Sequence, residues 1–367
     1  MFSWFSRSSQ ASESSLPLRH VLVIDTAATD WAATFAAADS AEAGGWPWKI
    51  EVTQAEWADV RVTAETSRGK RKTPLVFVRG GGAPCRPDLV LVRSLVRGLT
   101  PDRDYRNQMY ALRMAGVTAV NSWESIMNCQ ERPWLHAALL DLVDAVGHDA
   151  FPLIDQQLFP LAGSISFPSF MPCVIKVGHA EAGYGKMRVF SDKDLTDASS
   201  LLALHRDYAT IEPYIDEDAR EYDLRIQKIG PHIRAYKRYS PNWKGNVGTA
   251  LIEEIAVTPA YARWAELAAG LFGGIDICTV DAIHLHDGSD VILEVNDTAS
   301  GFMTGNEWED NLHVAAVVRA RLAGDDPCAG GSVLALHPPV SSEGNQTDAS
   351  QTDAGDVDDD SDWSSDQ

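Results

Sequence analysis

The stretch Thr279–Asp297, TVDAIHLHDGSDVILEVND, consists of two β-rich runs that are joined by Asp287 and Gly288. Asp-Gly is a strong signal for a two-residue hairpin turn. With the turn centred on these residues, His286 pairs with Ser289 and the two runs lie antiparallel. The sequence therefore predicts a β-hairpin here, in a register set by the turn.

In this register Asp281 lies opposite Glu294, and Asn296 lies on the same face because strand side chains alternate with a period of two. Two carboxylates that converge are costly unless a cation neutralises them. Oxygen ligands of this kind suit Mg²⁺, which is commonly held by carboxylates together with nucleotide phosphates, and Ca²⁺ also prefers them. The three residues are candidate metal ligands, and a solvated hairpin face is the alternative.

A second motif lies upstream, where the strand-like PCVIKVG leads into the loop HAEAGYGK, His179–Lys186. The small residues Gly183 and Gly185 allow backbone N–H groups to approach phosphate oxygens, and Lys176 and Lys186 supply positive charge. The loop matches neither the P-loop GxxxxGKS nor the dinucleotide fingerprint GxGxxG. By itself it also fits a plain β-turn.

Two further segments complete the set. ATIEPYID, Ala209–Asp216, is a short β-like run broken by Pro213, and its exposed backbone groups have the spacing needed to bind the edge of an adenine. Tyr222–Gly248 concentrates basic residues, as phosphoryl chemistry beside a bound metal requires. Its basic residues are Arg225, Lys228, Arg234, Lys237, Arg238 and Lys244. Alone, the first segment also fits a strand end and the second a charged strand face.

The order of these four motifs resembles the ATP-grasp arrangement, in which two α+β subdomains close on ATP. Before them, the β-rich runs VLVID, WKIEVTQ, TPLVFVR, DLVLVRS and GVTAVNS alternate with helical segments, which predicts a mostly parallel, helix-covered sheet. The polar piece 64–72 is expected to be a surface loop, and a helix is expected over Glu124–Val146. We expect a Rossmann-like pre-ATP-grasp α/β domain followed by an ATP-grasp domain. The expected boundaries are a flexible segment 1–17, the first domain 18–122, the ATP-grasp domain 123–325 and a disordered acidic tail 326–367.

Composition narrows the function classes. The five cysteines are scattered singly, which indicates neither a disulfide framework nor a zinc site and fits a reducing cytosol. A formal charge of −21 argues against nucleic acid as a partner. Nine acidic residues and no basic one lie in 343–366, as in a solvated extension, with a docking tail as the alternative. The aromatic start, with Phe2, Trp4 and Phe5, could contact a membrane surface.

Several stretches resemble the synapsin family, a match that covers roughly His20–Leu322. They are FPLIDQ, IKVGHAEAGYGK, YATIEPYID, RIQKIG, NWKGNVGTA and FGGIDICTVDAIH, with TDWA, QAEWAD, DYRN, AGVTAVNS and CQERPW upstream. The resemblance implies an ATP-binding protein on the cytoplasmic face of synaptic vesicles that regulates neurotransmitter release. It also implies a homodimer or homotetramer.

The resemblance implies roles for individual residues as well. Lys176, Lys186 and Lys244 would lie at the phosphates, and the backbone at Glu212 and Tyr214 would hold adenine. The metal positions would be Asp281 and Glu294. Further motif positions that would face the same pocket are Arg225, Arg238 and Asn246.

Some positions depart from the family pattern. Residues Glu294–Asp297 read EVND where synapsins usually show EVVG, so the metal-binding Asn of catalytic ATP-grasp enzymes is present as Asn296. Arg132 replaces a phosphate-contacting Lys, which retains the charge but changes the geometry. No Pro-rich region for SH3 partners is present. The alternatives are therefore a carbon–nitrogen ligase that forms an acyl phosphate, and a scaffold in which the nucleotide is structural.

Overall fold

The computed structural model describes residues 16–42, 45–165, 167–180, 183–240, 242–244, 250–325 and 327. All of them belong to one compact unit. The aromatic start, the acidic tail and the candidate residue Asn246 lie outside the described residues. The fold is the expected combination of helices and sheets, with three separate hydrophobic cores around three larger sheets.

The first sheet is parallel throughout, as predicted. Its strand order is β2 (Lys49–Ala55), β1 (Leu18–Ile24), β7 (Leu89–Val92) and β8 (Thr118–Val120). Between these strands the chain forms the helices α1 (Trp31–Ala41) and α2 (Arg106–Ala115). Helix α1 begins where Asp30 accepts a hydrogen bond from the Ala33 N–H, which satisfies a free donor of the first turn.

Two predictions for this region need correcting. The run TPLVFVR does form a strand, β6 (Leu75–Val78), but it pairs antiparallel with β3 (Val60–Thr63) outside the parallel sheet. The polar piece 64–72, predicted as a surface loop, is exposed but forms a hairpin of β4 (Thr66–Ser67) and β5 (Lys70–Arg71). Short strands of this kind form where a neighbouring segment offers a pairing partner, and the composition of the segment does not indicate that partner.

The helix predicted over Glu124–Val146 is in fact two helices, α3 (Trp123–Cys129) and α4 (Arg132–Val146). Pro133 is the second residue of α4. Proline has no N–H to donate, and its ring clashes with the carbonyl four residues earlier, so a helix cannot continue through it. The break brings the start of α4 to the candidate site.

The second sheet is antiparallel and has its own core. Its order is β11 (Lys186–Val189), β10 (Cys173–Val177), β12 (Ala209–Pro213) and β9 (Gln157–Phe159). Helix α5 (Asp192–Leu202) packs on it through Leu195, Ala198 and Leu202. The segment ATIEPYID thus supplies strand β12, which ends at Pro213 as predicted.

The third sheet has the order β15 (Leu251–Ile255), β14 (His232–Tyr239), β13 (Arg220–Ile229), β16 (Ile277–Leu285) and β17 (Asp290–Asn296). Helices α4 and α6 (Pro259–Ala269) cover one of its faces in the largest core. Because side chains alternate along each strand, the residues between the core positions point to the opposite face. That face carries the candidate metal ligands.

The turn between β16 and β17 differs from the prediction. His286 does not pair with Ser289; instead the Leu285 N–H donates to the Ser289 carbonyl, 2.9 Å away. The connection is therefore a three-residue loop that ends at Gly288, whose φ of 86° is left-handed. Three-residue hairpin loops commonly place glycine at this position.

A β-bulge restores the predicted register further along the hairpin. Ala282 pairs with Ile292, but Asp281 pairs with Glu294, so Leu293 is one extra residue on β17. A bulge of this kind re-aims the side chains that follow it. The pairing of Asp281 with Glu294 is thus as predicted, although the turn is not the reason for it.

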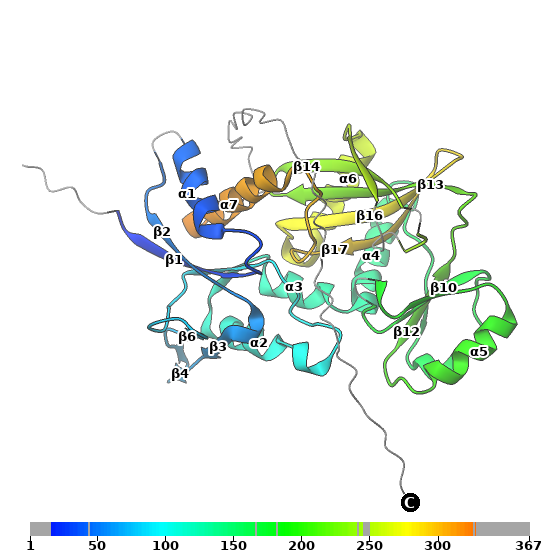
Figure 1. Ribbon diagram of the computed structural model, residues 1–367, viewed down its shortest axis with the longest axis horizontal. Coiled ribbons are helices and arrows are strands. Elements are labelled where there is room, and N and C mark those ends of the chain that lie inside the picture. Colours follow the sequence, from blue (N-terminus) through cyan, green and yellow to red (C-terminus); the bar gives the residue numbers. More distant parts are fainter. Residues whose placement is uncertain are drawn as a thin grey trace, which may run out of the picture. The chain divides into compact units, whose positions relative to one another are not determined.

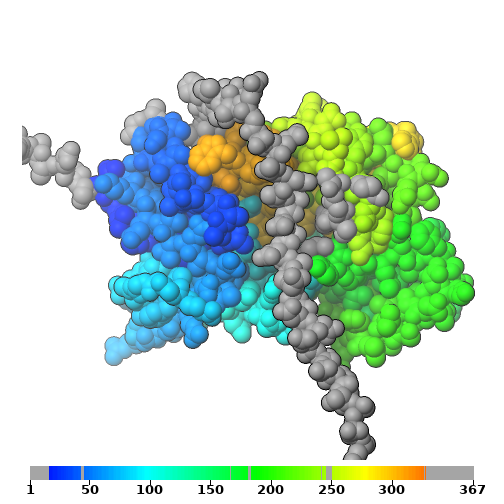
Figure 2. Space-filling view, viewed as in Figure 1, coloured from blue at the N-terminus to red at the C-terminus, as the bar shows by residue number. Residues whose placement is uncertain are grey.

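Specific contacts join the first sheet to the rest of the unit. Helix α7 (Glu307–Ala323), drawn in orange, packs against the blue helix α1 (Figure 1, Figure 2). The buried Asn121 side chain forms hydrogen bonds of 2.8 Å with both the N–H and the carbonyl of Ile277. None of the described helices combines the length and the hydropathy that crossing a membrane requires.

Candidate nucleotide and metal site

A cavity of about 950 Å³, counting the part open to solvent, lies between strands β10 and β12 of the second sheet and strands β13 and β16 of the third. Ten of the fourteen predicted site residues line it. These are Lys176, Gly183, Lys186, Glu212, Tyr214, Arg225, Arg238, Lys244, Asp281 and Glu294. The motifs that were separate in the sequence therefore meet at one place.

Positive charge is concentrated on the second sheet. Lys176 and Lys186 lie directly opposite each other on β10 and β11. Like charges in this position repel, so the pair is favourable only where anions neutralise it. Glu212 provides one, since its carboxylate accepts from the Lys176 ammonium at 2.7 Å and both side chains are about 95% buried, with exposures of 6% and 4%. Gln156 donates to the same carboxylate at 3.0 Å.

Arg132 joins this cluster from the start of α4. Its guanidinium donates to the Glu294 carboxylate and to the carbonyl groups of His179 and Ala180, at the beginning of the predicted phosphate loop. Arginine forms several such bonds at once because its five donors lie in one plane. The replacement of lysine by Arg132 thus links helix α4, the loop and a candidate metal ligand.

The pKa values of neighbouring groups reflect this crowding. Burial would raise the pKa of Glu294, but Arg132, Lys186 and Lys176 outweigh it, so the pKa lies well below its usual value. Glu294 itself raises the pKa of Lys186, while burial and the cations Lys176 and Arg132 bring it below normal. The cluster is therefore rich in cations and suited to an anionic group.

The candidate metal ligands lie together on the third sheet. Asp281 faces Glu294 across β16 and β17, and the Asn296 amide donates to the Asp281 carboxylate at 2.8 Å. Burial raises the pKa of Asp281, with Arg225, 3.6 Å away, opposing it. No group of three or more His, Cys, Asp or Glu side chains suited to a metal occurs among the described residues.

These residues fit a Mg²⁺ ion that is bound through a nucleotide rather than by protein alone. Mg²⁺ is usually held by one or two carboxylates with phosphate oxygens and water completing its shell. Asp281 and Glu294 supply two carboxylates, and Asn296 supplies an amide group beside them. The facing lysines lie on the other wall of the same cavity, where phosphates would be needed.

One of the backbone groups predicted to hold adenine has a partner within the protein. The Tyr214 N–H donates to the Pro172 carbonyl at 3.0 Å, because β12 continues to pair with the chain that enters β10. This N–H is therefore already bonded. The Tyr214 ring instead forms part of the cavity wall, edge-on to Trp243 with ring centroids 6.4 Å apart.

Loops also approach each other over the cavity. Lys244 donates to the Gly183 carbonyl at 3.0 Å, which joins the basic segment to the phosphate loop. Gly185 has a left-handed φ of 66°, and a Cβ there would lie 3.1 Å from the Val177 carbonyl oxygen. Glycine is thus required at this position for the loop to turn back onto β10.

Sequence reasoning missed several lining residues. Arg220, Asp223 and Trp243 line the cavity but were not among the predicted residues. Asp223 lies two positions before Arg225 on β13, so the period-two rule would have found it. Arg188 stacks over Trp243 at 4.9 Å and gives no comparable signal, since that contact joins two distant segments.

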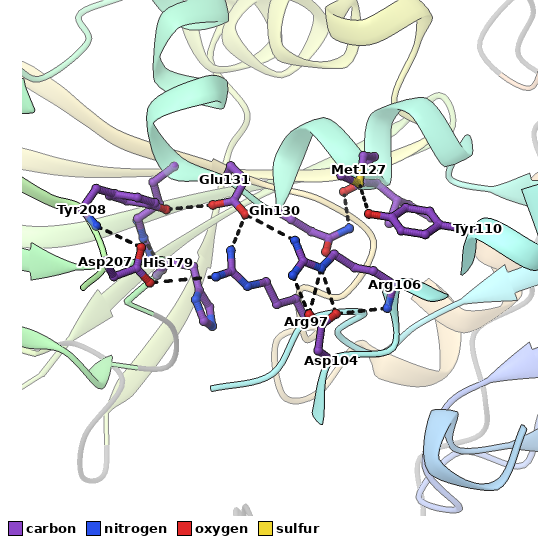
Figure 3. Close-up of polar contacts among 12 residues, drawn as sticks. Arg97, Asp104, Arg106, Tyr110, Met127, Gln130, Glu131, His179, Asp207 and Tyr208 are labelled. Atoms are coloured by element: carbon purple, nitrogen blue, oxygen red, sulfur yellow. Dashed lines mark hydrogen bonds and ion pairs between the residues drawn. The ribbon is translucent and has the colours of Figure 1, made fainter. Parts of the chain in front are cut away.

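A polar network surrounds the residue before Arg132 (Figure 3). Glu131 accepts hydrogen bonds from Arg97 and from the Tyr208 hydroxyl, and Arg106 lies 3.9 Å away. Arg97 is also 3.9 Å from Asp207. The start of α4 is therefore held between the first domain and the second sheet, and Arg132, its first residue, contacts Glu294 in the cavity wall.

Two family models match successive parts of this chain. Residues 15–119 match the family model of the synapsin pre-ATP-grasp domain, and residues 121–323 match the model of the synapsin ATP binding domain. Synapsin of Drosophila melanogaster is 33% identical over 310 residues, which are 82% of this chain and 29% of the fly protein. Human N-acetylaspartylglutamate synthase A is 24% identical over 242 residues, 63% of this chain and 59% of that protein.

Solved structures share the fold at low sequence identity. The macrocyclase MdnC from Microcystis aeruginosa MRC, bound with the precursor peptide MdnA, has a TM-score of 0.54 at 13% identity, and the match covers 82% of this chain and 98% of MdnC. The ATP-grasp ligase PsnB, in complex with a phosphomimetic variant of its minimal precursor, Mg and ADP, has a TM-score of 0.53 at 16% identity, covering 84% and 99%. These likenesses establish the ATP-grasp fold. The chain spans under a third of the fly relative and about three fifths of the human one. By its two matching domains and its similarity to the fly protein, the chain belongs to the synapsin family.

Proposed function

We propose that this protein binds ATP with a divalent cation in the cavity between the second and third sheets. The observation that carries the proposal is the pair of facing lysines, Lys176 and Lys186, on one wall and the paired carboxylates Asp281 and Glu294 on the other. Phosphates would neutralise the lysines, and a cation would bridge the phosphates to the carboxylates. Mg²⁺ is the expected ion, with Ca²⁺ as the alternative.

Thermal unfolding with ATP and Mg²⁺ or Ca²⁺ tests this binding. A ligand that binds only the folded state at 100 times its Kd stabilises it by about 2.7 kcal/mol, so a rise of several degrees in Tm is expected. Lys176→Ala and Glu294→Ala each reduce the shift, whereas Lys193→Ala, an exposed lysine on α5, leaves it unchanged. An equal shift in all three variants contradicts the assignment.

The proposed cellular role is that of a synapsin-like protein on the cytoplasmic face of vesicles, where it regulates neurotransmitter release. Family membership and the similarity to the fly synapsin support this role. We expect a homodimer or homotetramer and no nucleic-acid partner. Cell fractionation provides the test, since the protein should sediment with small vesicles. Recovery in the soluble fraction alone, with a monomeric mass by light scattering, rules out both expectations.

A second candidate is a carbon–nitrogen ligase that forms an acyl phosphate from ATP and a carboxylate. Asn296 beside Asp281 favours it, as does the similarity to a protein named as a synthase. Against it, the carbonyl groups of Ser300 and Gly301 accept from Arg93 and Arg225, so these cations are engaged where a substrate carboxylate would be needed. ADP formation that depends on both an added carboxylate and an amine distinguishes the ligase from the binding protein.

A further inference from the structure

Arg93 is the residue that follows strand β7, at the end of the parallel sheet of the first domain. Burial lowers the pKa of its guanidinium to about 10, although the carboxylates of Asp25 and Asp297 oppose this shift. Among the described residues, no carboxylate forms a direct ion pair with Arg93. A cation that is taken out of water is costly unless other groups bind it. The groups that bind Arg93 therefore indicate its function.

The Arg93 guanidinium binds the loop 298–302, which starts within two residues of the end of β17. It donates to the Thr298 carbonyl and, at 3.1 Å, to the Ser300 carbonyl, and its Cζ lies 4.1 Å from the centroid of the Phe302 ring. The Thr298 hydroxyl donates to the Val92 carbonyl at 2.6 Å. The segment directly after the candidate metal hairpin is thus attached to the first domain.

The loop 298–302 also binds Arg225, which lies on strand β13. The Arg225 guanidinium donates to the Ser300 hydroxyl and, at 3.0 Å, to the Gly301 carbonyl. The Ser300 hydroxyl lies 3.0 Å from the Thr279 hydroxyl on strand β16. Ser300 is therefore bound from two sides, its carbonyl by Arg93 and its side chain by Arg225. The loop connects a cation of the first domain to a cation of the third sheet.

These contacts hold Arg225 away from a candidate metal ligand. Its Nη1 lies 3.6 Å from the Asp281 carboxylate, which is longer than the hydrogen-bond range of about 2.7–3.2 Å, while its Nη2 is bound to the loop. The Arg225 Nε is buried and has no hydrogen-bond partner among the described residues. A guanidinium with unused donors pairs readily with a carboxylate through two parallel hydrogen bonds. Such a pair would neutralise Asp281 and compete with a metal ion for its oxygens.

We propose that Arg93 is a positioning residue of the first domain that controls cation binding at the nucleotide site. By fixing the loop 298–302 it holds Arg225 off Asp281, which leaves this carboxylate available to the cation. The inference rests on the proposed binding of ATP with a divalent cation. It gives the first domain a function in that binding, although none of its described residues lines the cavity.

Calorimetric titration of the full chain with ATP tests this function, in Mg²⁺ and in a chelator. The ratio of the two Kd values reports how much the cation strengthens binding. Arg93→Met should lower this ratio about tenfold, which is the effect of roughly one hydrogen bond to a charged group on an equilibrium constant. The Kd in the chelator should stay nearly unchanged, because the lysines on the other wall of the cavity are not affected.

Control variants separate this effect from a loss of stability. Asn121→Ala removes the hydrogen bonds to Ile277, at another point where the first domain meets the third sheet, so it should lower stability without changing the ratio. Arg263→Met, at an exposed position on α6, should change neither quantity. Ser300→Ala removes only the hydroxyl that binds Arg225 and should lower the ratio about threefold.

A double-variant cycle separates positioning from a general loss of charge. In an Arg225→Met protein the guanidinium that would pair with Asp281 is absent, so adding Arg93→Met should not lower the ratio further. An equal tenfold fall in that background overturns the inference, as does an unchanged ratio in Arg93→Met or, should that variant not fold, in Ser300→Ala.

The unmodified protein distinguishes a failure of this inference from a failure of the proposed function. If it binds no ATP, or binds ATP equally well with and without Mg²⁺, the proposed function fails and the inference fails with it. If Mg²⁺ strengthens ATP binding to the unmodified protein and strengthens it equally in Arg93→Met, the inference alone is refuted.

Discussion

The facing lysines of β10 and β11 allow a prediction in which stability and binding change in opposite directions. Burial and the neighbouring Lys176 and Arg132 hold the pKa of Lys186 below its usual value, despite the raising effect of Glu294. A lysine whose pKa is lower in the folded state destabilises the fold while it is charged. That cost is fully present below the folded-state pKa and disappears as the pH rises through the unfolded-state pKa.

Replacing Lys186 by Met removes the charge but keeps an unbranched apolar side chain. Like charges directly opposite each other on a sheet cost about 0.2–1 kcal/mol, so the variant's free energy of unfolding should rise by that amount. A hydrogen bond to a charged phosphate contributes about 1.5–3 kcal/mol, so the affinity for ATP with Mg²⁺ should fall about 10- to 100-fold. A misfolded variant could not show both changes.

Urea denaturation without nucleotide and calorimetric titration with ATP and Mg²⁺ measure the two effects. Lys193→Met, on the exposed surface of α5, is the control and should change neither quantity appreciably. A Lys186→Met protein that is more than about 1 kcal/mol less stable would show that the repulsion is not the dominant interaction there. Unchanged ATP affinity would show that Lys186 does not contact the phosphates.

Three further predictions concern stability. Lys176→Met should lower the free energy of unfolding by about 3–5 kcal/mol, because it leaves Glu212 buried without its counter-charge. In urea titrations, the double variant Lys176→Met with Glu212→Leu should recover most of this loss, and a double variant that is equally unstable contradicts the prediction. Burial and the stacked His232 lower the pKa of His313 to about 3. The contribution of His313 to stability is therefore retained above pH 6.5 and is lost as the pH drops toward 3. His313→Gln should flatten this dependence of the free energy of unfolding on pH. Asn121→Ala should cost about 2–3 kcal/mol, measured by thermal unfolding, because two buried backbone groups lose their partner; a change under 0.5 kcal/mol would argue against it.

Local patterns in the sequence were sufficient for much of the fold. The strands of the parallel sheet and strand β12, with its end at Pro213, were predictable. These features depend on residues that are close in sequence, through proline geometry and the period of two along a strand. The order of the four motifs then identified the ATP-grasp fold.

Tertiary structure decided the features that depend on distant segments. The bulge at Leu293 restores a register that the three-residue turn had shifted, and Ile292 and Val295 on either side of it lie in the core with α4 and α6. The contact of Arg132 with Glu294 joins residues 162 positions apart, and pairing with β10 engages the Tyr214 N–H. A sequence pattern specifies which face a side chain takes within its own element. The partner on that face is determined only when the elements pack, because many distant partners satisfy the same local pattern.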